Sequence, residues 1–408
     1  MIFEDADKLG FDADRLARLP DFFRSYLDKG RLSGMSILVA RDGKVAHLSH
    51  RGSSSLEDDG FEIDDSAIFR IYSMTKPITS VAIMMLYEQG LLQLHDPITK
   101  FLPTFKNVKV FDSGTARDYT TRDPERMITV HDLLTHQSGL SYDFLFTHPV
   151  DAIYRNMKVN GARSEGFDLA GLTDKLAELP LVFSPGTAWN YSVATDVLGR
   201  IVEVISGKTL DVFFQENIFD PLGMEDTSFT IADNKRHRLT HNYSRDPLKG
   251  TIELADSPAR TIYAPGRKFL SGGGGLLSSL GDYYKFADMV RRGGRLGDAR
   301  ILGRKTIDQM TRNHLPDNKT LRDCAMGTFS EVHMGGTGFG LGFSVVIDPG
   351  QTPVQSSARV HSWGGMASTF FWIDPVEDMI VILMTQMMPA ASYPLRPQLQ
   401  QMVYAALD

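Results

Sequence analysis

The sequence predicts an α+β protein, in which a central antiparallel sheet flanked by helices stands beside an all-helical domain. Two observations lead to this prediction. Pairs of strand-like apolar runs lie near both ends of the chain, each with a helical segment beside it, and helical periodicity fills the middle. Strands from the two ends form one sheet only if the termini come together, so we expect both termini to build the sheet.

The N-terminal region begins with a helix and continues as a hairpin. Apolar residues recur at helical spacing between Asp12 and Asp28. The runs 36–40 and 45–48 then lie on either side of Asp42-Gly43, a pair that is typical of a tight β-turn.

The C-terminal region mirrors this order. Two β-rich runs, 368–373 and 379–385, are separated by the five-residue turn 374–378, and residues 395–407 have helical spacing. They predict a second hairpin followed by a final helix.

The middle of the chain is mostly helical in pattern. We expect six helices there, near 77–89, 129–136, 149–158, 168–178, 193–206 and 209–216. Residues 107–126 are polar and are expected to form a surface insertion. The four glycines 272–275 precede a helix near Leu280, and we expect them to let the backbone pass close to a neighbouring helix or to the wall of the site.

These patterns divide the chain into two domains. An α/β domain is expected from residues 1–80 and 243–408, and a helical domain from residues 81–242. Pockets form preferentially between domains, so we expect the site in the cleft between them.

Composition excludes several classes of function. With 43 Lys and Arg against 50 Asp and Glu, the net charge of −7 argues against a nucleic-acid or anionic-membrane partner. Cys324 is the single cysteine, so no intramolecular disulfide forms. Residues 1–9 lack the order of a secretory signal, and the longest apolar runs are far shorter than the roughly 20 residues of a membrane span, so a cytoplasmic location is expected.

The first chemical motif is Ser73-Met-Thr-Lys76-Pro77, the one Ser-x-x-Lys in the sequence. Pro77 favours the first turn of a helix, and residues three apart share a helix face, so Ser73 and Lys76 lie side by side at its N-terminus. An enclosed lysine can act as a base for a serine nucleophile. A helix cap followed by a surface lysine is the alternative.

Two more motifs follow along the chain. Tyr191 lies between the turn Pro185-Gly186 and a predicted helix, where its phenol could enter a cleft or be a buried aromatic residue. The segment Trp363-Gly364-Gly365 precedes a strand, where glycines allow a ligand to approach the backbone or simply form a bulge.

The order of these three motifs resembles the serine β-lactamase and penicillin-binding protein superfamily. The likeness covers roughly residues 10–400 and includes LLTHQSGL at 133–140, Pro-Gly-Thr at 185–187 and FGLGF at 339–343. Within the superfamily the chain most resembles class C β-lactamases and the β-lactamase-like family VIII carboxylesterases. The resemblance therefore implies a β-lactamase-like fold.

The resemblance also implies roles for individual residues. Ser73 would be the nucleophile, Lys76 the adjacent base, and Tyr191 its partner in moving the proton, with the order of proton transfer left open. The backbone N–H groups of Ser73 and Met366 would form the oxyanion hole.

The expected substrate-binding residues are Trp363, Gly364, Gly365 and Tyr142, although Tyr142 could equally be a surface tyrosine. The chain has no Lys-Thr-Gly, and Trp363 stands where that lysine would meet a carboxylate. Val193 stands where class C enzymes have asparagine. Both departures favour neutral esters of short acyl groups.

We therefore expect a serine hydrolase that cleaves short-chain carboxylic esters through an acyl-serine intermediate. Three alternatives stay open: a β-lactamase or D,D-peptidase, an acyltransferase, and a non-catalytic penicillin-binding-like sensing module. The partner is a small-molecule ester, no cofactor is expected, and the oligomeric state is left open. His131 and His136 are poorly spaced for two ligands on one helix face, so no metal is expected and His136 is interpreted as a packed structural histidine.

Overall fold

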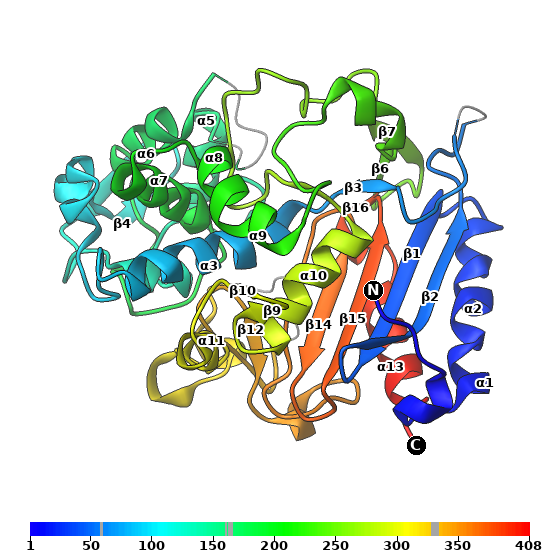
Figure 1. Cartoon of the computed structure of the whole chain (residues 1–408). Helices are drawn as coiled ribbons and strands as arrows, with labels where there is room; N and C mark the ends of the chain where they lie inside the picture. The colour runs from blue at the N-terminus through cyan, green and yellow to red at the C-terminus, as the bar shows by residue number, and fades with distance from the viewer. Residues whose placement is uncertain (58–59, 160, 162–165, 328–333) are drawn as a thin grey trace.

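A seven-stranded antiparallel sheet lies at the centre of the α/β part of the protein (Figure 1). The structure is a computed structural model that describes residues 1–57, 60–159, 161, 166–327 and 334–408. The sheet has the strand order β11-β12-β13-β14-β15-β1-β2. Its strands are β1 (Gly34–Arg41), β2 (Lys44–Gly52), β11 (Thr337–Phe339), β12 (Ser344–Val346), β13 (His361–Gly364), β14 (Phe370–Asp374) and β15 (Met379–Thr385).

The pairing of β1 with β15 joins the two ends of the chain. The register runs from Met35 opposite Thr385 to Arg41 opposite Met379, which confirms the prediction that both termini build one sheet. The first hairpin turns at Asp42 and Gly43, whose φ angles are 54° and 75°. Two positive φ angles are what a two-residue hairpin turn requires, and Asp-Gly tolerates them.

Helices cover both faces of the sheet. One face packs against α1 (Ala13–Leu16), α2 (Arg18–Leu27) and α13 (Leu395–Tyr404), and the other against α10 (Leu280–Arg291). Alternate β1 residues divide accordingly, with Ile37 on the α2 and α13 side and Leu38 on the α10 side. Burial of both faces explains why these strands are continuously apolar.

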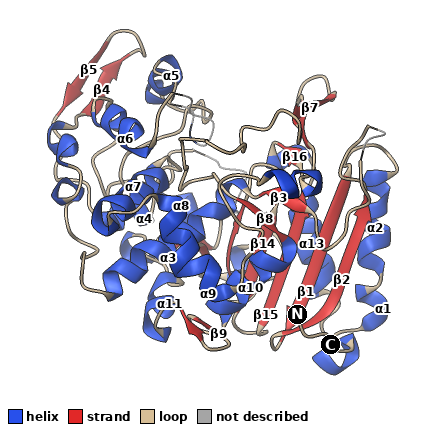
Figure 2. Ribbon diagram, turned by 45° about the horizontal axis from the view of Figure 1, so that its top comes forward, coloured by secondary structure: helices blue, strands red, loops and turns tan. Residues whose placement is uncertain are grey.

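The predicted helices of the middle region gather beside the sheet, as Figures 1 and 2 both show. They are α3 (Thr75–Glu88), α4 (Val130–Leu134), α5 (Pro149–Asn156), α6 (Leu169–Ala177), α7 (Ala194–Ser206) and α8 (Leu210–Phe214). A π-helical turn at Gln215–Phe219 and the short helix α9 (Asp220–Leu222), which was not predicted, follow α8. One continuous cluster of buried side chains joins these helices to the sheet, so the division at residues 80 and 242 stays a prediction.

Residues 107–126 are more ordered than the sequence indicated. They hold an exposed hairpin of β4 (Val110–Gly114) and β5 (Tyr119–Arg122), where Phe111 stacks on Tyr119 with ring centroids 5.9 Å apart. The expected surface insertion therefore contains two strands that the sequence did not indicate. The strand pattern was hidden because both strands are largely solvated and lack apolar alternation.

The remaining elements are short and lie around the main sheet. They are β3 (Ile68–Arg70), β6 (Asn242–Arg245), β7 (Ile252–Asp256), β8 (Leu277–Ser279), β9 (Arg295–Leu296), β10 (Ala299–Arg300), β16 (Met387–Met388), α11 (Arg304–Met310) and α12 (Leu321–Cys324). Among the described residues, no helix combines the length and the apolar character needed to cross a membrane.

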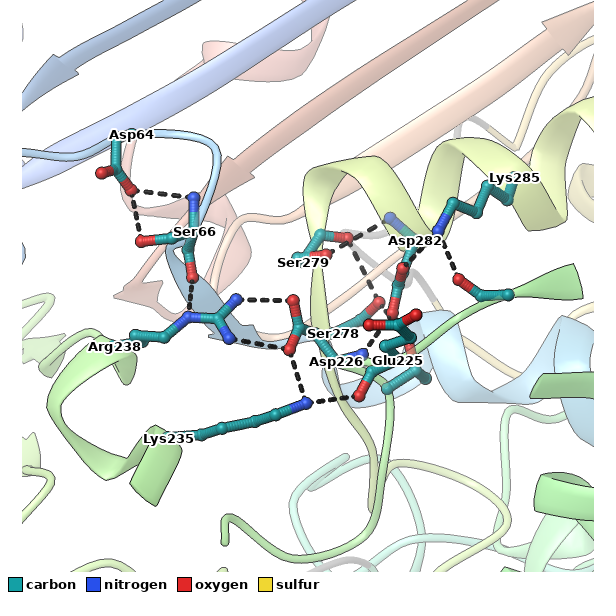
Figure 3. Close-up of polar contacts among 12 residues, drawn as sticks. Asp64, Ser66, Glu225, Asp226, Lys235, Arg238, Ser278, Ser279, Asp282 and Lys285 are labelled. Carbon is teal, nitrogen blue, oxygen red and sulfur yellow. Dashed lines mark hydrogen bonds and ion pairs between the residues drawn. The ribbon is translucent and has the colours of Figure 1, made fainter. Parts of the chain in front are cut away.

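An ionic cluster fastens the segment after α9 to the core (Figure 3). Asp226 accepts hydrogen bonds from Arg238 at 2.9 and 2.5 Å and from Lys235 at 2.8 Å. Its own N–H donates to Asp282 at the start of α10, and Arg238 also donates to the Ser66 carbonyl. Since Ser66 lies just before β3, the cluster supports the strand that leads into the candidate site.

Candidate active site

Ser73 lies in a tight turn between a strand and a long helix. Strand β3 ends at Arg70, residues Tyr72–Met74 form a single 3₁₀ turn, and α3 begins at Thr75. The sequence placed Ser73 at the helix start, and the structure places it in the turn just before that start. Tyr72 has a φ of 42°, a sparsely populated conformation, and Asn242 stabilises it by donating to its hydroxyl at 2.9 Å.

The Lys76 amine is buried one turn farther along α3, with the residue 1% exposed. Its Nζ donates to Ser73 Oγ at 3.2 Å, to the Tyr142 hydroxyl at 3.0 Å and to the Gly273 carbonyl at 2.7 Å. These three acceptors hold the buried amine in place beside Ser73 Oγ.

Tyr191 contacts the same hydroxyl. Its OH donates to Ser73 Oγ at 2.6 Å, and Lys76 Nζ lies 4.5 Å from the centre of its ring. The loop before α7 carries Tyr191 here, as the Pro-Gly turn and the following helix indicated. The structure therefore brings the three predicted catalytic side chains together.

Trp363 packs behind the phenol rather than standing open in a cleft. Its ring centroid lies 5.5 Å from that of Tyr191, and the residue is 1% exposed. The indole thus supports the orientation of Tyr191, while its predicted contact with substrate stays a prediction.

His136 supports Tyr191 from another side, with ring centroids 5.0 Å apart and Nδ1 within 3.1 Å of Ser192 Oγ. Burial, and secondarily the charge of Lys76, hold the pKa of His136 well below its usual range. The imidazole is therefore neutral, in agreement with a packed structural histidine.

Gly364 and Gly365 are needed because protein atoms approach them closely. A Cβ on Gly364 would lie 2.5 Å from the guanidinium carbon of Arg396, and one on Gly365 would lie 2.4 Å from the Ile71 carbonyl oxygen. This second contact presses the turn after β13 against the segment that carries Ser73. Met366 follows in that turn, where its N–H is a candidate for the oxyanion hole, and close approach of a ligand to the glycines stays a prediction.

Tyr142 lies deeper than a residue that merely lines a pocket. It is 4% exposed, accepts from Lys76 and stacks on Phe144 with ring centroids 4.8 Å apart. Burial first, and then the neighbouring Tyr191 and Asp196, raise the pKa of Tyr142 well above its usual value, so its hydroxyl keeps its proton.

Sequence reasoning missed Asp196 and the role of Gly273. Asp196 lies in the first turn of α7, fully buried, and accepts from the N–H of Gly273, whose carbonyl accepts from Lys76. A charged residue on the apolar face of a predicted helix was the available signal. The four-glycine run does pass close to neighbouring helices, since a Cβ on Gly272 would lie 2.7 Å from the Thr195 carbonyl oxygen.

A cavity of about 620 Å³ opens beside the residue that precedes Ser73. Its walls combine apolar residues such as Phe167, Ile262, Phe269 and Met388 with the charged residues Asp256, Arg260, Arg267 and Lys268. A cavity of this size, lined by both apolar and charged groups, can take a small organic substrate.

Other potential centres lack the required chemistry. Burial raises the pKa of the Cys324 thiol to about 11, so this cysteine is not an activated nucleophile. Within the described part of the chain, no three His, Cys, Asp or Glu side chains gather closely enough to hold a metal ion.

The serine β-lactamases and penicillin-binding proteins share this architecture: a sheet, an adjoining helical region and a serine in the turn just before a long helix. Residues 19–403 match the β-lactamase family, and the chain belongs to that family. The fold predicted from the motifs is thereby confirmed, and the protein is an enzyme of the β-lactamase fold with esterase relatives.

Three similar proteins include an esterase, an acyltransferase and a hydrolase of known structure. Esterase EstB of Burkholderia gladioli is 30% identical, covering 98% of both chains. Monacolin J acid methylbutanoyltransferase of Aspergillus terreus is 27% identical, covering 92% of both chains. The solved structure of EstCE1, described as a hydrolase with promiscuous acyltransferase activity, superposes with a TM-score of 0.80 at 24% identity and covers 97% of this chain and 99% of its own.

Proposed function

We propose that the protein is a serine carboxylesterase of the family VIII kind, which hydrolyses short-chain carboxylic esters through an acyl-Ser73 intermediate. The observation that carries the proposal is the position of Ser73 Oγ, 3.2 Å from Lys76 Nζ and 2.6 Å from the Tyr191 hydroxyl. A hydroxyl in contact with two proton-transfer groups is the arrangement of an activated nucleophile. Its similarity to Esterase EstB along nearly the whole chain supports the same reaction class.

In the first half of the reaction, Ser73 Oγ attacks the carbonyl carbon of the ester and its proton passes to the Lys76 and Tyr191 pair. The carbonyl oxygen becomes an oxyanion, which the N–H groups of Ser73 and Met366 stabilise. Such donors are worth about 2.7–4 kcal/mol each. The intermediate then collapses, the C–O bond to the alcohol breaks, and the alcohol takes up the proton held by the pair.

In the second half, a water molecule attacks the acyl-Ser73 carbonyl and gives a proton to the same pair. Collapse of this second intermediate breaks the bond to Ser73 Oγ, which recovers its proton, and the carboxylic acid leaves. Each half uses the pair once as a base and once as an acid, so the site returns to its starting state.

The neutral-ester preference rests on Trp363, which is buried behind Tyr191 and stands where the penicillin-directed members of the superfamily carry a lysine. An indole in place of a lysine offers no charge for a carboxylate at that position. Turnover of nitrocefin against p-nitrophenyl butyrate tests the β-lactamase and peptidase alternative. We expect the butyrate ester to be cleaved much faster, and a preference for nitrocefin would reverse the assignment.

Acyl transfer is the second candidate. The observation that favours it is the similarity to a methylbutanoyltransferase along 92% of the chain. An added alcohol would then compete with water for acyl-Ser73. Product analysis with and without that alcohol distinguishes hydrolysis from transfer.

The expected cytoplasmic location stays a prediction.

Covalent labelling tests the proposal directly. We expect a fluorophosphonate probe to modify Ser73 alone, as read by mass spectrometry of the digested protein. Ser228, which is half-buried as Ser73 is and whose hydroxyl donates to the Thr230 carbonyl, is the internal control. Labelling of another serine, or of none while esterase activity persists, would overturn the proposal; no labelling together with no esterase activity would support the sensing-module alternative.

A further inference from the structure

Asp196 is a fully buried carboxylate beside the proposed catalytic lysine. Its Oδ1 accepts from Ser271 Oγ at 2.5 Å and from the Gly273 N–H at 3.1 Å. Its Oδ2 has no hydrogen-bond partner among the residues that the structure describes. An isolated buried charge is costly, so a carboxylate kept here needs a compensating positive charge nearby.

Gly273 connects this carboxylate to Lys76. Its N–H donates to Asp196, and its carbonyl accepts from Lys76 Nζ at 2.7 Å. A Cβ on Gly273 would lie 2.9 Å from Asp196 Oδ2 and 3.1 Å from the Tyr142 hydroxyl. The turn is therefore held between Asp196 and Tyr142, with little room for its carbonyl to move.

We propose that Asp196 is a positioning residue, which fixes the turn at Ser271 and Gly273 and, through the Gly273 carbonyl, holds the Lys76 amine against Ser73. The inference rests on the proposed function, because it assigns Lys76 a part in proton transfer. Misplacement of a reacting group by about 1 Å can lower the rate about 100-fold, so the position of the Lys76 amine has a large effect on activity.

The charge of Asp196 acts on the same amine. Burial raises the pKa of Asp196, while the Ser271 hydrogen bond and the charge of Lys76 oppose that rise. The titratable groups nearest Lys76 on its other sides are Tyr142, Tyr191 and His136. The positive charge of Arg267 also interacts with Asp196.

The negative charge of the Asp196 carboxylate favours the protonated form of the Lys76 and Tyr191 pair, whichever member holds the proton. Removal of that charge makes the pair lose its proton at lower pH.

Asp196→Asn tests the charge while keeping an oxygen that can accept from Ser271 and Gly273. The measurement is the pH profile of kcat/KM for p-nitrophenyl butyrate. We expect the acidic limb to move to lower pH by about one unit, since a nearby opposite charge shifts a titration by about 1–3 units. An acidic limb at the wild-type position would overturn the proposal.

Asp374→Asn is the matched control. Asp374 is also fully buried, and its carboxylate accepts from two backbone N–H groups and from the Tyr404 hydroxyl. It lies at the end of β14 and makes none of the Lys76 contacts. We expect this variant to lose stability and to keep the wild-type acidic limb. An equal shift in both variants would also overturn the proposal, because it would reflect general destabilisation.

Gly273→Ala tests the connection without changing any charge. The added methyl displaces the turn, so we expect kcat to fall at least about tenfold while KM changes less than about twofold. Wild-type kcat would overturn the positioning role even if Asp196→Asn did not fold. The two proposals fail separately: active Ser73→Ala rejects the proposed function, whereas inactive Ser73→Ala together with a wild-type profile for Asp196→Asn rejects this inference alone.

Discussion

Side chains from two distant parts of the chain meet at the Ser73 hydroxyl. Ser73 and Lys76 come from the same helix start, and Tyr191 arrives from 118 residues farther along. The spacing of Ser73 and Lys76 could be read from the sequence because i and i+3 share a helix face. The contact with Tyr191 could be inferred only by resemblance, since no local pattern brings that loop to Ser73.

Ser73→Ala removes the proposed nucleophile, and Lys76→Ala removes the amine beside it. We expect kcat to fall by a factor of about 10³ or more in each, as is usual when a member of a nucleophilic unit is lost. Alanine fits the turn before α3, so circular dichroism of Ser73→Ala should match the wild type. Retention of a substantial share of the wild-type rate by Ser73→Ala would refute the nucleophile assignment.

Tyr191→Phe removes one hydroxyl and keeps the ring that packs on Trp363. We expect kcat to fall about 10²–10⁴-fold, the usual contribution of a proton-transfer group. The free energy of unfolding in urea should change by about 1 kcal/mol, as expected for one hydrogen bond. A large loss of stability with unchanged kcat would indicate that the phenol is structural.

At the scale of elements, the sequence predicted the hairpins and long helices well, because two-residue and 3.6-residue periods are local signals. It missed the β4–β5 hairpin, whose strands are exposed, and it did not predict the short pairs such as β3 with β8. These short strands are paired with distant segments, so their formation depends on the assembled fold.

Asp226→Ala tests the ionic cluster that fastens the segment after α9 (Figure 3). Burial alone would raise the pKa of Asp226, but hydrogen bonds from Arg238 and Lys235 lower it below its usual value. The substitution leaves both cations without this partner in a partly buried site. We expect a loss of about 1–3 kcal/mol in the free energy of unfolding, measured in urea.

Arg24 is the control for this prediction, since its ion pair with Asp21 is exposed. Arg24→Ala should change stability by less than about 1 kcal/mol. If both variants were equally stable, the cluster would have no role in holding the segment.

At the scale of the whole molecule, one buried and two half-buried histidines make stability depend on pH. Burial lowers the pKa of His47, His131 and His361 to about 4. In the unfolded chain each binds its proton near pH 6.5. Between about pH 6.5 and 4 the unfolded state therefore holds more protons, and stability falls as the pH falls through this window.

His361→Asn isolates one of these contributions. A difference of one pKa unit corresponds to 1.36 kcal/mol. Between pH 7 and pH 5 the free energy of unfolding of the wild type should therefore fall by about 2 kcal/mol more than that of the variant, as measured by urea unfolding at both pH values. Asp196 and Asp282, whose pKa values are raised by burial, act in the opposite direction, but they are common to both proteins and cancel in the comparison. Parallel losses in the two proteins would contradict the prediction.

The sequence by itself determined the strand pairs at both ends, the helices between them and the serine–lysine spacing, because each depends on neighbours within a few residues. Only the tertiary structure decided that Tyr142 and Gly273 share the Lys76 amine, that Trp363 packs behind Tyr191, and that a buried carboxylate at Asp196 lies beneath the site. Such contacts arise when separate elements are packed together, and burial then changes the chemistry of groups that look ordinary along the chain.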